Sequence, residues 1–337
     1  MKQTVTAVLL VLGLAWTSPA SETKKEEAKK PLRIGLSFDS LAVERWQKDR
    51  DIFIAAAKDL GAECYFLSAE GDARTQNEQC EVLLNKGIDV LVIIPKSATA
   101  AARAVKQAHL RSIPVLAYDR LILNCDLDLY ISFDNVRVGR MQAEYLSKRH
   151  KGRYFLLGGS PDDNNAKLFR RGQLEVLAPL IKSKEIEIIG NQWADGWSPK
   201  KAREIVENLL VNVGTDIDVI VASNDGTAGG AIQALKAQGL AGKVAISGQD
   251  ADLQACKRIL AGTQTMTVYK PLKALATKAA ELAVRLATGK AIETDQSLHN
   301  GKLEVPSVLL DPITLDKGNL VEVLTRDGYY TKEALME

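Results

Sequence analysis

The chain has few cysteines, few histidines and, beyond residue 30, no apolar run long enough to cross a membrane as a helix. Of its 337 residues, 4 are cysteine and 3 are histidine. The cysteines never stand in a Cys-x-x-Cys pair and the histidines lie far apart, so neither residue type forms a pattern typical of a zinc site. The sequence therefore gives no support for a metal centre, and it excludes a small disulfide-stapled scaffold.

An excess of either charge is also absent. The 44 Lys and Arg residues nearly balance the 42 Asp and Glu residues, which leaves a formal net charge of +2. A chain so close to neutral has no electrostatic field that would predict nucleic acid or a membrane surface as its partner. The hydrophobic share of 46% and the chain length instead indicate packed globular structure, with room for two domains of ordinary size.

The first 30 residues have the pattern of a processing segment. Lys2 is followed by an apolar stretch over 5–16 and then by small residues that end at Ala20. This pattern predicts a secretory signal peptide over residues 1–20, cleaved near Ala20, followed by a charged leader over residues 21–30. We expect the mature protein to be exported, and to lack a lipid anchor because no cysteine follows the apolar stretch.

Export raises the question of disulfides, since these bonds persist in oxidising compartments. The four cysteines, Cys64, Cys80, Cys125 and Cys256, are spaced widely and irregularly along the chain. Buried cysteine also serves as a small apolar side chain. Both the paired and the free state are therefore open from the sequence.

From residue 32 onward, short apolar runs rich in β-branched residues alternate with longer stretches of helical periodicity. This alternation is typical of parallel sheets covered by helices on both faces. One helix is especially clear over 272–286, where apolar residues recur at the spacing of a single buried face. The predicted strands cover 32–38, 62–68, 90–95, 114–118, 129–133, 154–158, 187–192, 219–223, 244–248 and 265–269.

So many strands suit two sheets, of about five or six strands each, better than one very large sheet. We therefore predict an α/β fold with two doubly wound parallel-sheet lobes joined by a multi-strand hinge. The predicted N-terminal lobe comprises 31–134 plus 271–304, and the predicted C-terminal lobe comprises 135–270 plus 305–337. Two apolar runs of the tail, 305–310 and 320–324, are expected to form an edge strand and a hinge segment.

Polar side chains follow the predicted strands, at the positions where open α/β sheets bind ligands. Asp, Asn and Ser at such positions also cap helices, so capping is an equal alternative for any single one of them. Capping does not explain Arg120, Lys270 or the tryptophans Trp193 and Trp197. Carboxylates, amides and cations together can pair with every hydroxyl of a polyol, and aromatic faces can cover the apolar side of a sugar ring. The pattern therefore predicts a carbohydrate ligand.

Catalytic interpretations lack the residues that they need. Lys96 and Ser97 follow a strand without the glycines of a phosphate-binding loop. Within 158–162, Asp162 stands where a nucleophile elbow needs glycine. The adjacent Asp162 and Asp163 could serve a glycosidase, but the sequence does not locate a partner carboxylate. We expect no catalytic residue, no metal ion and no cofactor.

Several long motifs resemble those of one family, and together they span nearly all of the chain after residue 30. They are ERWQKDR at 44–50, YDR at 118–120, YISFDN at 130–135, GGSPDDNNAKLF at 158–169, QWADGW at 192–197, ASNDGTAGGAIQAL at 222–235, SGQDAD at 247–252 and TQTMTVYKP at 263–271. The chain thus resembles the type I periplasmic sugar-binding proteins of bacterial ABC transporters. The resemblance implies a periplasmic receptor that closes around a monosaccharide, D-xylose first, with ribose, arabinose, glucose and galactose as alternatives. It also implies a monomer that delivers the sugar to a membrane permease.

The same resemblance implies a set of ligand contacts shared between the lobes. They are Arg45, Trp46, Asp119 and Arg120 on the N-terminal lobe, Asp163, Asn165, Trp197, Asn224 and Asp250 on the C-terminal lobe, and Lys270 at a crossover. Other interpretations stay open at this point, because tryptophans at strand ends also fill cores. Arg45 could form a surface ion pair with Glu44 or Asp49, and Arg120 could pair with Asp119.

Two other classes of protein compete with a receptor. A sugar-responsive transcription factor of the same fold would need an N-terminal pair of DNA-binding helices, and in this chain the signal sequence occupies that position. A sugar-processing enzyme would need a nucleophile and a base, and the sequence assigns neither. The receptor is therefore the interpretation that the residues favour.

Overall fold

The computed structural model describes residues 1, 4, 30–294 and 296–337. The predicted signal peptide and its cleavage point near Ala20 lie outside the described residues, apart from residues 1 and 4, and so does the leader up to residue 29. The chain divides into two units, Met1–Lys30 and Pro31–Glu337, and all the helices and strands belong to the second. In the part of the chain that the structure describes, no helix combines the length and apolarity needed to cross a membrane.

A seven-stranded sheet forms the first half of this unit. Its strands, in spatial order, are β11 (Gln296–His299), β12 (Glu304–Leu310), β5 (Leu129–Phe133), β4 (Val115–Tyr118), β3 (Val90–Ile94), β1 (Leu32–Phe38) and β2 (Ala62–Ser68). All neighbours pair in parallel except β11, which runs antiparallel to β12. Parallel strands need crossover connections, and here helices supply most of them.

Helices cover both faces of this sheet. They are α1 (Glu44–Asp59) and α9 (Leu272–Ala287) on one face and α2 (Ala73–Asn85) and α3 (Ala102–His109) on the other. Strand β3 explains why, because successive side chains of a strand point to opposite faces. Val90 and Val92 pack with α1 and α9, whereas Leu91 and Ile93 pack with α2 and α3.

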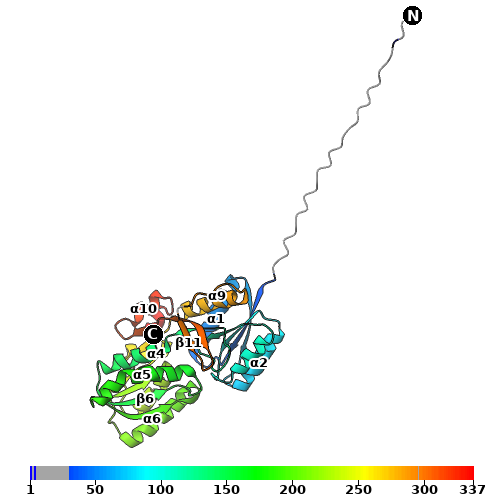
Figure 1. Ribbon diagram of the computed structural model, residues 1–337. Helices are drawn as coiled ribbons and strands as arrows, with labels where there is room; N and C mark the ends of the chain where they lie inside the picture. Colours follow the sequence, from blue (N-terminus) through cyan, green and yellow to red (C-terminus); the bar gives the residue numbers. More distant parts are fainter. Residues whose placement is uncertain (2–3, 5–29, 295) are drawn as a thin grey trace. The chain divides into compact units, whose positions relative to one another are not determined.

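A four-stranded parallel sheet forms the second half. Its spatial order is β7 (Ile186–Trp193), β6 (Gly152–Gly158), β8 (Val219–Ala222) and β9 (Ala245–Ile246). One face packs on α4 (Asn135–Ser147) and α5 (Asn164–Lys182), and the other on α6 (Pro199–Val213) and α7 (Asp225–Ala237). Figure 1 shows α4, α5, β6 and α6 together in one layered body, with α1, α9 and α2 in the other.

The C-terminal segment adds a small third cluster. Strands β10 (Thr267–Tyr269) and β13 (Ile313–Leu315) form an antiparallel pair. Helices α10 (Leu320–Arg326) and α11 (Lys332–Met336) bury their apolar side chains against α8 (Leu253–Leu260), which follows β9. The last helices therefore pack with elements of the second half.

The strand prediction is confirmed in outline and corrected in its tail. Every predicted strand has a counterpart, although β9 is reduced to two residues. The sheets have seven and four strands instead of five or six each. Residues 305–310 were predicted as an edge strand of the second lobe, but β12 pairs in parallel with β5 inside the first sheet and β11 forms its edge. Residues 320–324, predicted as a hinge segment, lie in helix α10.

These errors have one physical cause. An apolar run indicates that a segment is buried. Which strand it pairs with depends on which sheet edge lies next to that segment in the folded chain. The remaining limits of the two lobes stay a prediction.

Of the cysteines, Cys64, Cys80 and Cys125 are free thiols, and the Cys256 thiol lies 3.5 Å from the Ala251 carbonyl oxygen.

Candidate ligand-binding site

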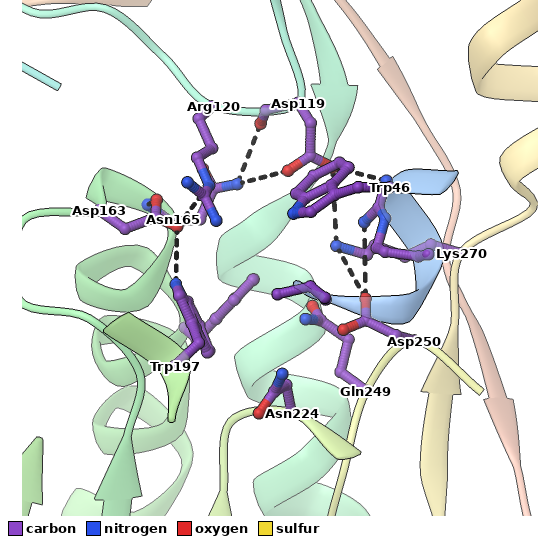
Figure 2. Close-up of a pocket in the computed structure, with 13 residues that line it drawn as sticks. Trp46, Asp119, Arg120, Asp163, Asn165, Trp197, Asn224, Gln249, Asp250 and Lys270 are labelled. Carbon is purple, nitrogen blue, oxygen red and sulfur yellow. Dashed lines mark hydrogen bonds and ion pairs between the residues drawn. The ribbon is translucent and has the colours of Figure 1, made fainter. Parts of the chain in front are cut away.

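A cavity lies where the carboxyl ends of strands from both sheets meet. It contains about 310 Å³ of space not filled by atoms, part of which is open to solvent. The lining residues are Val43, Arg45, Trp46, Asp119, Arg120, Asp163, Asn165, Phe169, Trp197, Asn224, Gln249, Asp250 and Lys270. All ten residues predicted from the sequence are among them, and Figure 2, which labels all of these except Arg45, shows the labelled side chains gathered around the cavity.

Each side chain reaches the cavity because of where its strand or helix ends. Asp119 and Arg120 directly follow β4, and Lys270 directly follows β10. Asp163 and Asn224 are the N-caps of α5 and α7. The capping interpretation is thus correct for both, since Asp163 accepts from the Asn165 N–H at 2.8 Å and Asn224 accepts from the Thr227 N–H at 2.9 Å. Capping and lining the cavity coexist in the same side chain.

Arg45 joins carboxylates that come from the two sheets. Its guanidinium lies 3.0 Å from Asp119, which follows β4, and 3.5 Å from Asp250, which follows β9. Lys270 repeats the pattern, with its Nζ 3.4 Å from Asp250 and 3.7 Å from Asp119. Behind Arg45, Asp49 pairs at 3.0 Å, so the predicted alternative partner is real, although the pair is buried and not on the surface.

Arg120 forms the second bridge across the cavity. Its Nη1 donates to Asp39 at 2.7 Å on the side of the first sheet, and its Nε lies 2.7 Å from Asp163 at the start of α5. Asp163 also accepts from the Trp197 indole N–H at 3.1 Å. Charged hydrogen bonds of this kind are stronger than neutral ones, so these side chains hold fixed positions.

The two tryptophans line the cavity and pack in apolar clusters at the same time. Trp46 is 3% exposed and belongs to the core beneath α1 and α9, and the Arg45 guanidinium lies 4.3 Å from its ring centroid. Trp197 is 8% exposed and meets Phe169 edge to face at a centroid distance of 6.3 Å. The core-filling interpretation is therefore compatible with a place in the cavity lining for both rings.

Three site residues have backbones in the left-handed region, where side chains other than glycine are uncommon. The φ angles are +61° at Asp119, +58° at Trp197 and +101° at Asp250. Such residues cost on the order of 1–3 kcal/mol each and persist only where the surroundings hold them. Backbone hydrogen bonds do so here, from Asp119 N–H to the Ile131 carbonyl at 2.8 Å and from Asp250 N–H to the Val268 carbonyl at 2.9 Å. Clustered strain of this kind points to a functional site.

Burial and neighbouring charges shift the pKa values of Asp119 and Asp163 in opposite directions. Burial raises the pKa of the Asp119 carboxyl, but the positive charges of Arg45 and Lys270 lower it by more, so its pKa lies below the usual value. At Asp163 burial dominates and raises the pKa, although the charge of Arg120 opposes the shift. Asp119 is therefore an ionised acceptor across the whole physiological pH range.

The ten ligand contacts chosen from the sequence leave out three lining residues, Val43, Phe169 and Gln249. Gln249 is the most informative, because its side chain is 3% exposed and its Oε1 has no hydrogen-bond partner among the described residues. A signal was present, since Gln249 stands beside Asp250 in the SGQDAD motif after a predicted strand. The side chain of Asn165 is instead committed within the protein, donating to the Asp119 carbonyl oxygen at 2.9 Å. The roles of all these residues toward a ligand stay predictions.

The donor set suits a neutral, many-hydroxyl molecule. Carboxylates accept, guanidinium and ammonium groups donate, and the glutamine amide can do both. The described residues contain no group of three or more His, Cys, Asp or Glu side chains placed to hold a metal ion. The cavity therefore offers recognition by hydrogen bonds and aromatic contact.

Comparison with known proteins decides the family. A family model described as periplasmic binding protein domain matches residues 34–291. The chain belongs to this family. The resemblance seen in the motifs is thereby confirmed, and the fold is that of a type I periplasmic binding protein.

Two curated relatives cover nearly the whole chain. A D-xylose-binding periplasmic protein of Haemophilus influenzae is 56% identical over 330 residues, covering 98% of both chains. A D-xylose-binding periplasmic protein of Escherichia coli is 54% identical over 307 residues, covering 91% of this chain and 93% of the relative. A solved ABC transporter solute-binding protein of Clostridium phytofermentans, with bound β-D-glucose, superposes with a TM-score of 0.85 at 30% identity, covering 90% and 99% of the two chains.

Proposed function

We propose that this periplasmic binding protein is a non-enzymatic receptor for D-xylose that closes around the sugar and delivers it to an ABC transporter permease. The observation that carries the proposal is the cavity in which cations and carboxylates from both sheets converge. Relatives named as D-xylose-binding, at 56% and 54% identity, support the choice of sugar.

The energetics of the cavity are adequate for tight binding. Hydrogen bonds to charged groups contribute roughly 1.5–3 kcal/mol each. Three or four of them, with a ring stacked on Trp46 or Trp197, reach the roughly 8 kcal/mol that corresponds to a micromolar dissociation constant. Both tryptophans line the cavity, and they would also limit the room for the extra hydroxymethyl group of a hexose.

The division of the site between two sheets supports a closing motion. A ligand shifts a conformational equilibrium only as far as it binds one state better than the other. A sugar bonded to Asp119 and Arg120 from one half and to Asp250 from the other binds best when the halves are together. Hinge closure of periplasmic binding proteins is a general precedent for this motion.

A second candidate keeps the fold and changes the sugar. The solved relative from Clostridium phytofermentans holds β-D-glucose at 30% identity, which supports a hexose as the alternative ligand. A receptor of either kind would work as a monomer in the periplasm, after removal of residues 1–20 by cleavage near Ala20.

Calorimetric titration of residues 21–337, unfolded and refolded to remove co-purified sugar, tests the proposal. The ligands are D-xylose, D-ribose, L-arabinose, D-glucose and D-galactose. We expect one-to-one binding that is tightest for D-xylose, without any turnover of the sugar detected by chromatography. Stronger binding of D-glucose than of D-xylose would select the second candidate, and binding of none of the sugars would overturn both.

A further inference from the structure

A lysine outside the cavity lies over two neighbouring tyrosine rings. Lys48 lies three residues after Arg45 on α1, and its Nζ is 4.1 Å from the ring centroid of Tyr329 and 3.9 Å from that of Tyr330. The two tyrosine rings contact each other at a centroid distance of 4.7 Å. An ammonium over aromatic faces is attracted by their negative quadrupoles, and more strongly where water is excluded.

This contact joins parts of the molecule that have separate cores. Helix α1 packs with α9 on the seven-stranded sheet, and Figure 1 shows the two helices side by side. The tyrosines follow α10, whose apolar side chains pack with residues of α8 such as Ile259. The tyrosines are tied to the same cluster, because Tyr329 contacts Tyr269 at a centroid distance of 5.1 Å. Lys48 thus reaches from the first half to the second.

The position of Lys48 connects the contact to the cavity. Residues three apart on a helix share a face, so Lys48 and Arg45 lie on the same side of α1. Arg45 in turn bonds to Asp250, which the chain places just before α8. The contact of Lys48 with the C-terminal segment therefore helps to keep Arg45 close to Asp250 of the second half.

We propose that Lys48, Tyr329 and Tyr330 form a positioning clamp, outside the cavity, that holds the two halves together around the ligand and thereby sets how long the ligand stays bound. The clamp rests on the proposed receptor function and adds residues to it that do not touch the sugar. It can form only while α1 lies against the C-terminal segment, so it stabilises the closed arrangement and not an open one. Loss of the clamp should speed dissociation and leave association nearly unchanged.

The experiment is stopped-flow tryptophan fluorescence with D-xylose on matched variants. Lys48→Met removes the charge at similar length, and Lys48→Arg keeps it. Tyr329→Leu combined with Tyr330→Leu removes the rings, and Tyr329→Phe combined with Tyr330→Phe keeps them. Lys58→Met is the control, because Lys58 is an exposed lysine near the other end of α1.

We expect the dissociation rate to rise about two- to thirtyfold in Lys48→Met and in the double leucine variant, the range that a cation–π contact covers. Lys48→Arg and the double phenylalanine variant should stay within about twofold of the native rate, as should Lys58→Met. Combining Lys48→Met with the two leucine substitutions should raise the dissociation rate by less than the product of the separate effects, because both changes remove the contact between the ammonium group and the rings.

Two results would overturn the clamp. One is an unchanged dissociation rate in Lys48→Met with native sugar affinity. The other is a dissociation rate that rises as much in the arginine and phenylalanine variants as in the methionine and leucine variants. That result would indicate general packing instead of an attraction between a cation and aromatic rings. A native protein that binds no sugar at all would overturn the receptor function itself. That outcome differs from failure of the clamp, because neither the native protein nor any variant would then change its fluorescence with D-xylose.

Discussion

At the scale of single residues, the site is organised by buried charges that each have several partners. Asp119 accepts from Arg45 at 3.0 Å and from the Asn165 amide at 3.1 Å, and Lys270 lies 3.7 Å away. Desolvation of such charges is costly, so each one depends on its partners remaining in place. A change that alters charge but not shape therefore isolates the electrostatic role of a side chain.

Asp119→Asn should raise the dissociation constant for D-xylose about tenfold to a hundredfold, because it removes one charged acceptor and leaves Arg45 and Lys270 with fewer counter-charges. Titration calorimetry measures the change, and circular dichroism checks that the variant is folded. Asp59→Asn is the matched control, since Asp59 is exposed at the end of α1. A folded Asp119→Asn protein with native affinity would contradict the assigned role.

A second buried carboxylate, Asp225, makes stability depend on pH. It begins α7 and accepts from Gln264 at 2.7 Å and from Thr267 at 2.9 Å. Burial, followed by the negative charge of Asp250, raises the pKa of Asp225 to about 7. In the unfolded chain an aspartate has a pKa of about 3.9. Between these two values the folded protein holds a proton that the unfolded chain releases, so this contribution to stability is lost as pH rises toward about 7.

The native protein should therefore lose unfolding free energy, on the order of a few kcal/mol, between pH 5 and pH 8, relative to Asp225→Asn, which cannot titrate there. Urea unfolding of both proteins at the two pH values measures this difference. Parallel pH dependence in the two proteins would show that Asp225 is ionised in the folded state throughout.

At the scale of elements, helices α4 and α5 determine how the second half presents its cavity residues. They approach so closely that a Cβ on Gly139 would overlap the carbonyl oxygen of Phe169, and one on Gly172 would overlap that of Val136. Phe169 lines the cavity, and Asp163 and Asn165 lie at the start of the same helix. The position of three lining residues thus depends on glycine in a helix interior, where it otherwise costs stability.

Gly139→Ala should lower the unfolding free energy by about 2 kcal/mol or more and weaken sugar binding, because backbone atoms must move to admit the methyl group. Chemical denaturation and titration calorimetry together test both effects. Gly229→Ala in α7 is the comparison, since its Cβ would meet only the flexible end of Arg258 at 3.2 Å. There helix propensity should leave stability unchanged or raise it by up to about 1 kcal/mol. Equal effects at the two glycines would contradict the close-packing argument.

At the scale of the whole molecule, binding and stability are linked because the cavity draws on both halves. A ligand that binds only the folded protein stabilises it by about 2.7 kcal/mol at a concentration one hundred times its dissociation constant. Neither half alone contains the complete set of donors and acceptors, since Asp119 follows β4 and Asp250 follows β9.

Saturating D-xylose should therefore raise the melting temperature of the native protein by several degrees, and by much less in Asp250→Asn at the same sugar concentration. Differential scanning fluorimetry over a series of sugar concentrations measures the shift. L-Arabinose serves as the comparison for sugar specificity. The linkage argument would be contradicted by a shift of equal size in Asp250→Asn.

The sequence by itself determined the layered α/β architecture and the chemistry of the site. Each strand predicted from apolar periodicity has a counterpart in the fold, and several of the polar residues after those strands line one cavity, although Trp193 does not. Both signals are local, because burial sets the period of a segment and parallel strands place their carboxyl ends at one edge. Resemblance to a family then selected ten of these residues, and the family is confirmed.

Only the tertiary structure decided which distant residues meet. Several contacts join segments that lie far apart in the chain. Arg45 bridges Asp119 and Asp250, β12 pairs with β5, and Lys48 lies over Tyr329. The same holds for the difference between two cavity amides, because the Asn165 side chain donates to Asp119 whereas Oε1 of Gln249 has no hydrogen-bond partner among the described residues. Composition and period carry no record of such pairings, because they arise from the packing of whole elements and not from the order of neighbouring residues.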